Sequence, residues 1–173
     1  PMAHNLLRAG TVLKVYNRTP EKTQPLVAAG AEQMASARAV VEGAEIVFLM
    51  LANGDAIKAV MHGEDGILAA IAPGKTIIDM STIAPEESQT FAREVADRGG
   101  RYIDAPVSGS VGAAEAAQLI ILAGATATEL AHYQCYLDLL GRKTIAFGGD
   151  GKGSSAKLAI NLLLGITGQG IAE

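Results

Sequence analysis

The sequence predicts an α/β fold, in which a doubly wound and mostly parallel sheet carries helices on both faces. Short aliphatic runs alternate with helical stretches along the chain, the order typical of strand–helix–strand crossover units. The runs "EIVFLML" (45–51) and "LIILAG" (119–124) are apolar at nearly every position, as expected of strands covered on both faces. The composition, 49% hydrophobic and 18% charged, indicates a globular domain with a sizeable core.

The expected strands are β-branched or aliphatic runs that end at Gly, Pro, Asn or Ser. Strands are predicted at 11–17, 45–51, 75–81, 101–106, 119–124 and 143–148. Helices are predicted at 2–9, 21–29, 36–43, 55–63, 85–99 and 127–141. The helix over 85–99 has the clearest boundaries. Pro85 begins a first turn that is rich in Glu, and Gly99 ends the helix.

The chain divides into two expected parts. Residues 1–150 form the α/β domain, and residues 151–173 begin a helix that leaves it. The loop "GGDGKGSS" (148–155) marks the boundary, so this helix is expected to start near Ser154 or Ser155 and, being apolar, to be buried. The sequence opens inside one helix and stops inside another, and both ends are expected to be truncations of a longer protein.

Composition argues against several classes of function. The net charge is −4, and basic and acidic residues are interspersed along the chain without a basic stripe, so no nucleic-acid partner is expected. The apolar runs are too short for a membrane span, and three scattered histidines with one cysteine predict no metal site. The single Cys135 cannot form an internal disulfide, which fits a reducing, cytoplasmic location, and its helical context predicts burial.

In a doubly wound sheet, ligands bind beyond the carboxyl ends of the strands. After the first expected strand, "YNRTPEK" offers Asn17, Arg18 and Thr19, with Lys22 one turn further on. Guanidinium, hydroxyl and ammonium groups suit a 2′-phosphate, whereas an NAD site places an acidic residue at this strand end. These residues therefore favour NADP(H) over NAD(H). A solvated helix start with Thr19 as its cap is the alternative interpretation.

The next two strand ends offer further candidates. Met50 and Leu51 end the strand at 45–51, and Ala52 and Asn53 follow it. These residues are uncharged, so they could lie flat beneath a cofactor. Ser81 ends the strand at 75–81 and Thr82 follows it, close to the start of a helix. Their hydroxyls could bind a ligand, but capping of the helix is the commoner use of such a pair.

The segment "DAPVSGS" (104–110) follows a strand without entering a helix at once, and it sets Ser108, Gly109 and Ser110 in a row. Successive backbone N–H groups with small side chains can form a concave anion site, which a substrate carboxylate would fit. An ordinary turn of small residues is the alternative.

The segment "GKGSSAKLAIN" (151–161) places two polar residues in an apolar helix. Lys157 and Asn161 are spaced i,i+4 and therefore share one face. A polar pair on one face of an apolar helix has either a functional or a structural explanation. The structural alternative is a lysine that extends its ammonium group to water beside a satisfied core amide.

Four motifs together resemble the β-hydroxyacid dehydrogenase family, which includes 3-hydroxyisobutyrate dehydrogenase, tartronate semialdehyde reductase and the glyoxylate/succinic semialdehyde reductases. In chain order they are "VYNRTPEK", "DMSTIAPEES", "DAPVSGSVGAAEAAQLIILAG" and "GKGSSAKLAINLLLG". The resemblance covers residues 1–173. It implies a Rossmann-like NADP-binding domain over 1–150, the start of an all-helical domain over 151–173, and a homodimer or homotetramer formed through that helical domain.

The resemblance also implies roles for individual residues. Thr82 would bind the cofactor, and Lys157 would be the catalytic lysine with Asn161 beside it. Ser108, Gly109 and Ser110 would bind the substrate. The family's Gly-x-Gly-x-x-Gly loop would precede Pro1, so the chain alone is expected to be inactive.

The implied reaction is hydride transfer between NADP(H) and a small carboxylated aldehyde or hydroxyacid of the glyoxylate or succinic semialdehyde type. One alternative is an NAD-dependent dehydrogenase of the 3-hydroxyisobutyrate or tartronate semialdehyde type, against which Arg18 argues. Another is a non-catalytic module that retains the fold, and a lysine paired with an amide in an apolar helix argues against that.

Overall fold

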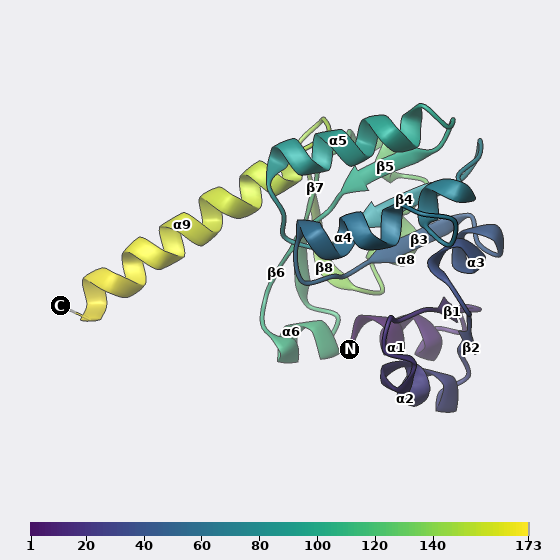
Figure 1. The fold of residues 1–173 in the computed structure, drawn as a ribbon. Helices are drawn as coiled ribbons and strands as arrows, with labels where there is room; N and C mark the ends of the chain where they lie inside the picture. Colours follow the sequence, from purple (N-terminus) through teal and green to yellow (C-terminus); the bar gives the residue numbers. More distant parts are fainter. Residues whose placement is uncertain (173) are drawn as a thin grey trace.

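The structure, a computed structural model, describes the backbone of residues 1–172 and the side chains of residues 1–169. Its strands and helices alternate, and most strand pairs are parallel, so the predicted α/β fold is confirmed (Figure 1). The strands are β1 (Lys14–Val15), β2 (Glu32–Gln33), β3 (Ile46–Leu49), β4 (Thr76–Asp79), β5 (Arg101–Asp104), β6 (Val107–Ser108), β7 (Leu119–Ala123) and β8 (Gly141–Ala146).

The helices between and after these strands include two short 3-10 segments. The α-helices are α1 (Met2–Arg8), α2 (Gln24–Ala28), α3 (Ala37–Glu42), α4 (Gly54–Met61), α5 (Pro85–Ala96), α6 (Val111–Glu115), α7 (Ala127–Leu130), α8 (Gln134–Leu137) and α9 (Lys152–Ala172). The 3-10 segments are η1 (Pro20–Thr23) and η2 (Ile67–Ala69).

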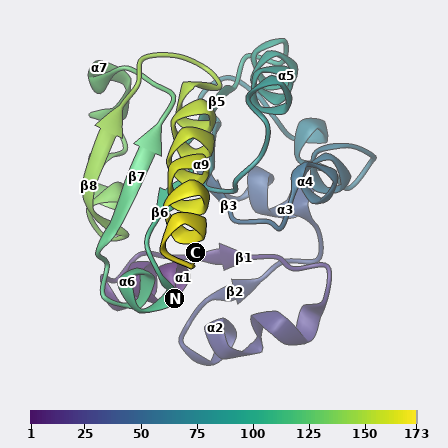
Figure 2. The same ribbon diagram turned by 90° about the vertical axis from the view of Figure 1, so that its left-hand side faces the viewer.

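The strands form three sheets. β1 pairs in parallel with β2, and β3, β4 and β5 form a parallel sheet in that order. In the third sheet β7 pairs in parallel with β8 and antiparallel with β6. The Gly124 amide donates to the Asp104 carbonyl (2.7 Å), so the segment leaving β5 lies beside β7 and joins the second and third sheets. In Figure 2, β7 and β8 lie to the left of α9, with α4 and α5 to its right.

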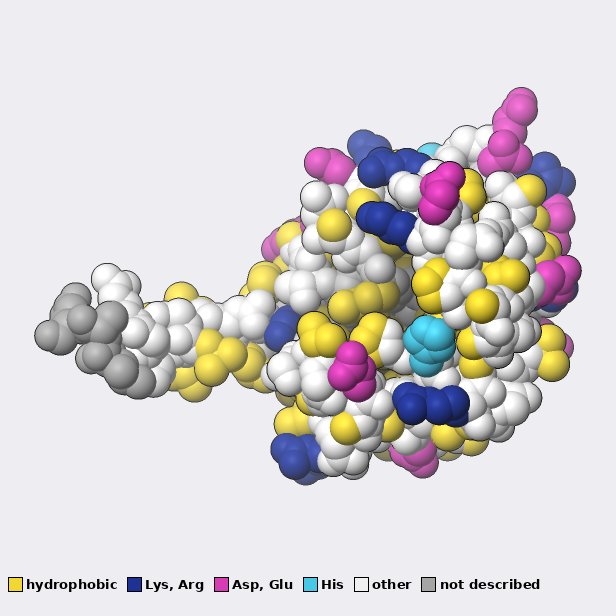
Figure 3. Space-filling model, turned by 90° about the horizontal axis from the view of Figure 1, so that it is seen from below, with side chains coloured by type: hydrophobic (Ala, Val, Ile, Leu, Met, Phe, Trp, Pro, Cys, Tyr) yellow, Lys and Arg dark blue, Asp and Glu magenta, His cyan; other side chains and the backbone are white. Residues whose placement is uncertain are grey.

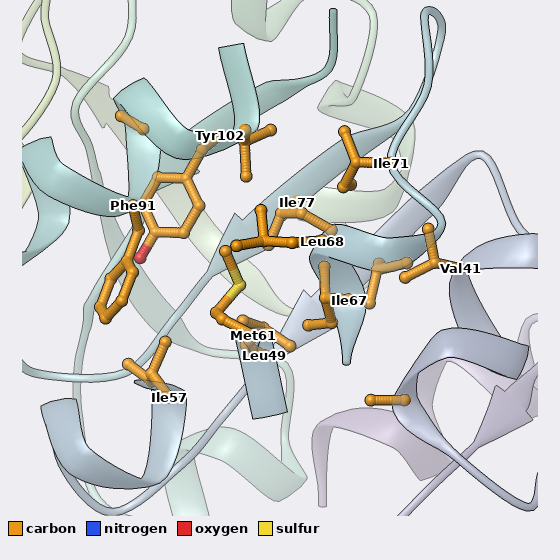
Figure 4. Packing of buried hydrophobic residues seen from close by; sticks show 14 of the residues in the cluster. Val41, Leu49, Ile57, Met61, Ile67, Leu68, Ile71, Ile77, Phe91 and Tyr102 are labelled. Atoms are coloured by element: carbon orange, nitrogen blue, oxygen red, sulfur yellow. The ribbon is translucent and has the colours of Figure 1, made fainter. Parts of the chain in front are cut away.

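The central strands are buried on both faces, as their apolar sequences predict. Ile77 and Ile78 are adjacent on β4, and each belongs to a different hydrophobic cluster. On one face Ile77 packs with side chains of α3, α4 and α5, including Ile57 and Phe91 (Figure 4). On the other face, Ile78 packs with Leu137 of α8 and with α1.

Side-chain caps fix where several helices begin. Ser36, Asn53, Ser110 and Thr126 each accept a backbone N–H from the residue three positions further on. Such a cap satisfies one of the amides that a helix start leaves unpaired. The helix after each of these loops therefore starts at a position set by its own sequence.

Several predicted boundaries were wrong. The helix predicted at 127–141 is broken into α7 and α8, and Gly141 belongs to β8. The strands β2 and β6 and the short helix α6 were not predicted. Each of these three elements has five residues or fewer, too few to show a hydrophobic period. Cys135 is exposed, not buried as expected, because its segment forms only the single-turn helix α8 on the surface.

The C-terminal helix also differs from expectation. α9 begins at Lys152, two residues before Ser154, and it projects from the body of the molecule (Figure 1). Its apolar side chains beyond the first turns are exposed, so the prediction of a buried helix was wrong (Figure 3). Leu162 is 66% exposed and Ile166 is 62% exposed. None of the described helices combines the length and apolar character that a membrane crossing requires.

The two faces of β4 give a stability prediction. Ile77 is fully buried, so Ile77→Ala should lower the free energy of unfolding by about 2–5 kcal/mol, measured by chemical denaturation. Ile166→Ala makes the same chemical change on the exposed part of α9 and should alter stability far less. Equal losses from the two substitutions would contradict the assignment of the core.

Candidate active site

The candidate site lies where the parallel strands end. β3, β4 and β5 point the same way, so the loops that follow them emerge at one edge of the sheet. The loop after β3 carries Met50, Leu51 and Ala52, and the loop after β4 carries Thr82. The segment after β5 leads through β6 to Ser108.

A cavity of about 550 Å³ lies between β1 and β3. Within the described part of the chain, β1 is paired only with β2 and β3 only with β4, so the strand edges that line the cavity are free. Four residues predicted to bind the cofactor line this cavity: Asn17, Lys22, Met50 and Leu51. The structure therefore brings together polar groups that follow β1 and apolar groups that follow β3.

The other four predicted cofactor residues do not line the cavity. Arg18 and Thr19 lie exposed beside Asn17, whose Oδ1 accepts the Thr19 amide (2.9 Å). Thr19 is the N-cap residue of η1, as the alternative interpretation of an exposed helix start expects, although its side chain makes no capping hydrogen bond. Ala52 and Thr82 are also exposed, and Thr82 does not cap α5, whose N-cap residue is Ala84.

A buried polar chain that sequence reasoning missed ties the loops after β3 and β4 together. The Leu51 amide donates to Ser81 Oγ (2.9 Å), and the Ser81 amide donates to Asp79 Oδ1 (2.9 Å). The Tyr102 hydroxyl donates to the other oxygen of Asp79 (2.6 Å). Burial raises the pKa of the Asp79 carboxyl, against the opposing effect of the hydrogen bonds from Ser81 and Tyr102. The sequence did carry a signal for this network, because Asp79 ends an otherwise apolar strand. A carboxylate buried at such a position needs hydrogen-bond donors.

The predicted substrate segment begins in β6 and ends at α6. Ser108 is half-buried in β6, and Gly109 is exposed. Ser110 is the N-cap of α6, because its Oγ accepts the Ala113 amide (3.2 Å). The side chain of one of the three predicted residues is therefore engaged in capping.

The two predicted residues of α9 lie in its second and third turns. Lys157 is half-buried and Asn161 is exposed. Among the described side chains, neither residue has a hydrogen-bond or ion-pair partner for its polar head group. α9 contacts β5 and β7 through its N-terminal part. No cluster of His, Cys, Asp or Glu able to hold a metal ion occurs within the described residues.

A parallel sheet with helices on both faces defines a dinucleotide-binding α/β domain when polar and apolar groups also gather just beyond the carboxyl ends of its strands, as Asn17, Lys22 and Met50 do at the end of this cavity. Residues 1–149 match the family model described as the NAD binding domain of 6-phosphogluconate dehydrogenase. The chain therefore belongs to this family, and its relatives are hydroxyacid dehydrogenases.

All 173 residues align with three characterised relatives. The chain is 41% identical to 3-hydroxyisobutyrate dehydrogenase of Pseudomonas aeruginosa and covers 58% of that protein. It is 36% identical to 2-hydroxy-3-oxopropionate reductase of Escherichia coli, covering 59%. It is 34% identical to glyoxylate/succinic semialdehyde reductase 2 of Arabidopsis thaliana, a chloroplastic protein, covering 48%. The chain thus spans about half to three-fifths of the length of these relatives.

Solved structures agree with the fold. The 3-hydroxyisobutyrate dehydrogenase of Mycobacterium tuberculosis with L-serine superposes with a TM-score of 0.88 at 32% identity, covering 95% of this chain and 55% of that one. Psf3 in complex with NADP+ and 2-OPP gives a TM-score of 0.89 at 26% identity, covering 99% of this chain and 63% of that one. These matches confirm the Rossmann-like fold predicted from the sequence.

The link between the two loops can be tested by removing one oxygen. Ser81→Ala leaves the Leu51 amide without its acceptor and should lower the free energy of unfolding by about 1–3 kcal/mol, measured by denaturant titration. Ser155→Ala removes the same atom from an exposed position and should have little effect, because that hydroxyl donates to the carbonyl of Gly151, the residue just before its own helix (2.9 Å). A Ser81→Ala protein as stable as the Ser155→Ala control would show that this hydrogen bond does not hold the loops.

Proposed function

We propose that the chain is the cofactor-binding part of an NADP(H)-dependent oxidoreductase that interconverts a small carboxylated aldehyde and the corresponding hydroxyacid. The observation that carries the proposal is the grouping of Asn17, Lys22, Met50 and Leu51 at the end of the cavity, just beyond the carboxyl ends of β1 and β3. Membership of the hydroxyacid dehydrogenase family supports the reaction class.

The residues around the cavity fit a dinucleotide. Lys22 and the exposed Arg18 supply positive charge after β1, and no acidic residue lies between Tyr16 and Thr19 to hold a free ribose 2′-hydroxyl. This composition favours a 2′-phosphate and so NADP(H). Met50 and Leu51 would lie beneath the other half of the cofactor, with Thr82 nearby as a hydroxyl donor. When bound, NADP(H) supplies or accepts the hydride.

The free edges of β1 and β3 support a second part of the proposal. Each edge offers unpaired backbone N–H and C=O groups to the cavity, and an additional parallel strand between them would satisfy both. We propose that a segment preceding Pro1 supplies this strand and the glycine-rich loop after it. That loop would bring backbone amides to the pyrophosphate at the start of α1.

The substrate would be held by the segment after β5 and by α9. Ser108, Gly109 and Ser110 would bind its carboxylate through backbone and side-chain donors. The Lys157 ammonium would give a proton to the substrate oxygen on reduction, and the Lys157 amine would take it back on oxidation. Asn161, one turn further along α9, would orient the lysine or the substrate.

The substrate branch is part of the proposal. We favour a glyoxylate or succinic semialdehyde type of substrate, on the resemblance of the segment from Ser108 to Gly124 to that branch. The names of the aligned relatives span this branch, the 3-hydroxyisobutyrate dehydrogenases and the 2-hydroxy-3-oxopropionate reductases. All of these names describe small hydroxyacids or their aldehydes, so the substrate class is better supported than the particular member.

The exposed apolar residues of α9 support a larger assembly. Leu162, Leu163 and Leu164 are each more than 60% exposed, and a helix that is apolar on all sides is normally covered by other helices. We propose that residues 151–173 open an all-helical domain and that the full-length protein forms a homodimer or homotetramer through it. A cytoplasmic location fits the single cysteine.

The choice of cofactor can be tested at Arg18. In the full-length protein, Arg18→Ala should cost about 1.5–3 kcal/mol of NADPH binding, the range for a hydrogen bond to a charged group, and should leave NADH binding nearly unchanged. Titration calorimetry or cofactor fluorescence would measure both affinities. Arg142→Ala removes an exposed guanidinium from β8, away from the cavity, and should change neither. Equal losses for NADPH and NADH in Arg18→Ala would mean that Arg18 does not recognise the 2′-phosphate.

The reaction can be tested at Lys157. In the full-length protein, Lys157→Ala should lower kcat by at least about 100-fold, the low end of what a positioned acid or base contributes. NADPH binding should change little, because the proposed cofactor contacts lie on other elements. Lys157→Arg should restore little activity, since a guanidinium keeps the charge but scarcely releases a proton. A folded Lys157→Ala protein with near-normal kcat would end this mechanism.

A further inference from the structure

The carboxylate of Asp104 joins the end of β5 to the start of α9. Asp104 is 2% exposed, and its two oxygens accept backbone amides from residues about fifty positions further along the chain. The Gly151 amide donates to Oδ1 (2.9 Å), and the Ser154 amide donates to Oδ2 (2.7 Å). A buried carboxylate at this position satisfies amides that the first turn of α9 leaves unpaired, and its charge complements the positive end of the helix dipole.

The backbone around the Asp104 carboxylate is closely packed. A methyl group at Gly124, which directly follows β7, would collide with Asp104 Oδ1, and one at Gly153 of α9 would collide with the carbonyl oxygen of Leu122. The backbones of β5, β7 and the start of α9 are therefore in close contact with one another. Ser154 is 1% exposed, so the first turn of α9 is enclosed at this position.

The rest of α9 has no comparable attachment within the described residues. From Leu158 onwards most of its side chains are exposed, and the helix projects from the domain (Figures 1 and 3). Among the described residues, the contacts that fix its direction and its rotation about its own axis are therefore those of the first turn. Lys157 lies three residues beyond Ser154, less than one helical turn away, so the position of its Cα follows directly from this attachment.

From this geometry we infer that Asp104 is a positioning residue, which sets the place of Lys157 at the candidate active site by holding the start of α9 against β5. This inference rests on the proposed catalytic role of Lys157. Asp104 itself makes no contact with substrate in this scheme and exchanges no proton. Burial raises the pKa of the Asp104 carboxyl, and the hydrogen bonds from Ser154 and Gly151, which favour the charged form, oppose that rise.

The decisive variant is Asp104→Asn in the full-length protein. It keeps the shape of the side chain but turns one acceptor into a donor, so one of the two amides loses its partner. We expect kcat to fall by about 10- to 100-fold, the cost of displacing a catalytic group by about 1 Å, while NADPH affinity stays close to that of the unmutated protein. Amide hydrogen exchange at Ser154 and Lys157 should speed up in the same variant.

Asp150→Asn is the matched control. Asp150 directly precedes Gly151, but its carboxylate is bound by Arg101 (2.7 Å) and not by α9. The Asp150→Asn variant should therefore leave kcat and the rate of hydrogen exchange at the α9 amides unchanged. If Asp104→Asn does not fold, Gly124→Ala serves in its place, because it keeps the charge and presses one methyl group against the Asp104 carboxylate.

A double mutant separates this inference from the proposed function. If Asp104 acts through Lys157, Asp104→Asn should lower kcat in the unmutated protein but add no further loss in a Lys157→Ala background. The same fold-loss in both backgrounds would overturn the positioning role, as would full activity of Asp104→Asn alone. Near-normal turnover by Lys157→Ala would refute the proposed function, and the role of Asp104 would fall with it.

Discussion

The parallel alignment of β3, β4 and β5 is the constraint on which the candidate site depends. Because these strands run the same way, the segments that follow them begin at one edge of the sheet. The register pairs Leu49, Asp79 and Asp104, the last residue of each strand, as neighbours across the sheet. Residues far apart in the sequence are therefore brought to the same edge by the pairing of the strands.

Two buried carboxylates at the ends of these strands hold the segments that follow the sheet in place. Asp79 and Asp104 are both almost fully buried, and both accept backbone amides from the segments beyond the sheet. Asp79 holds Ser81 and through it Leu51, on the side of the cavity. Asp104 holds α9, which carries Lys157. Burial of a charged group is costly, so an unpaired amide in either network would weaken the edge as a whole.

Much of this fold could be predicted from the sequence, because long apolar strands and capped helices carry strong periodic signals. The strands at Ile46–Leu49 and Thr76–Asp79 lie within the predicted ranges. The two-residue strands β2 and β6 gave no such signal. The exposure of α9 could not be predicted either, because an apolar helix is expected to be buried and the direction of α9 depends on Asp104.

The candidate site was predictable in part for the same reason. Residues directly after strands, such as Asn17 and Leu51, were found by reading the strand ends, and both line the cavity. The acceptor roles of Asp79 and Asp104 depend on partners that only the folded chain brings close.

The most direct test of the account is the fate of deuterium from NADPH labelled at its transferable position. The full-length protein would be incubated with the labelled cofactor and glyoxylate or, separately, succinic semialdehyde. We expect deuterium on the former carbonyl carbon of the hydroxyacid product, detected by mass spectrometry. Binding of NADPH without deuterium in the product from either aldehyde would contradict the proposed reaction.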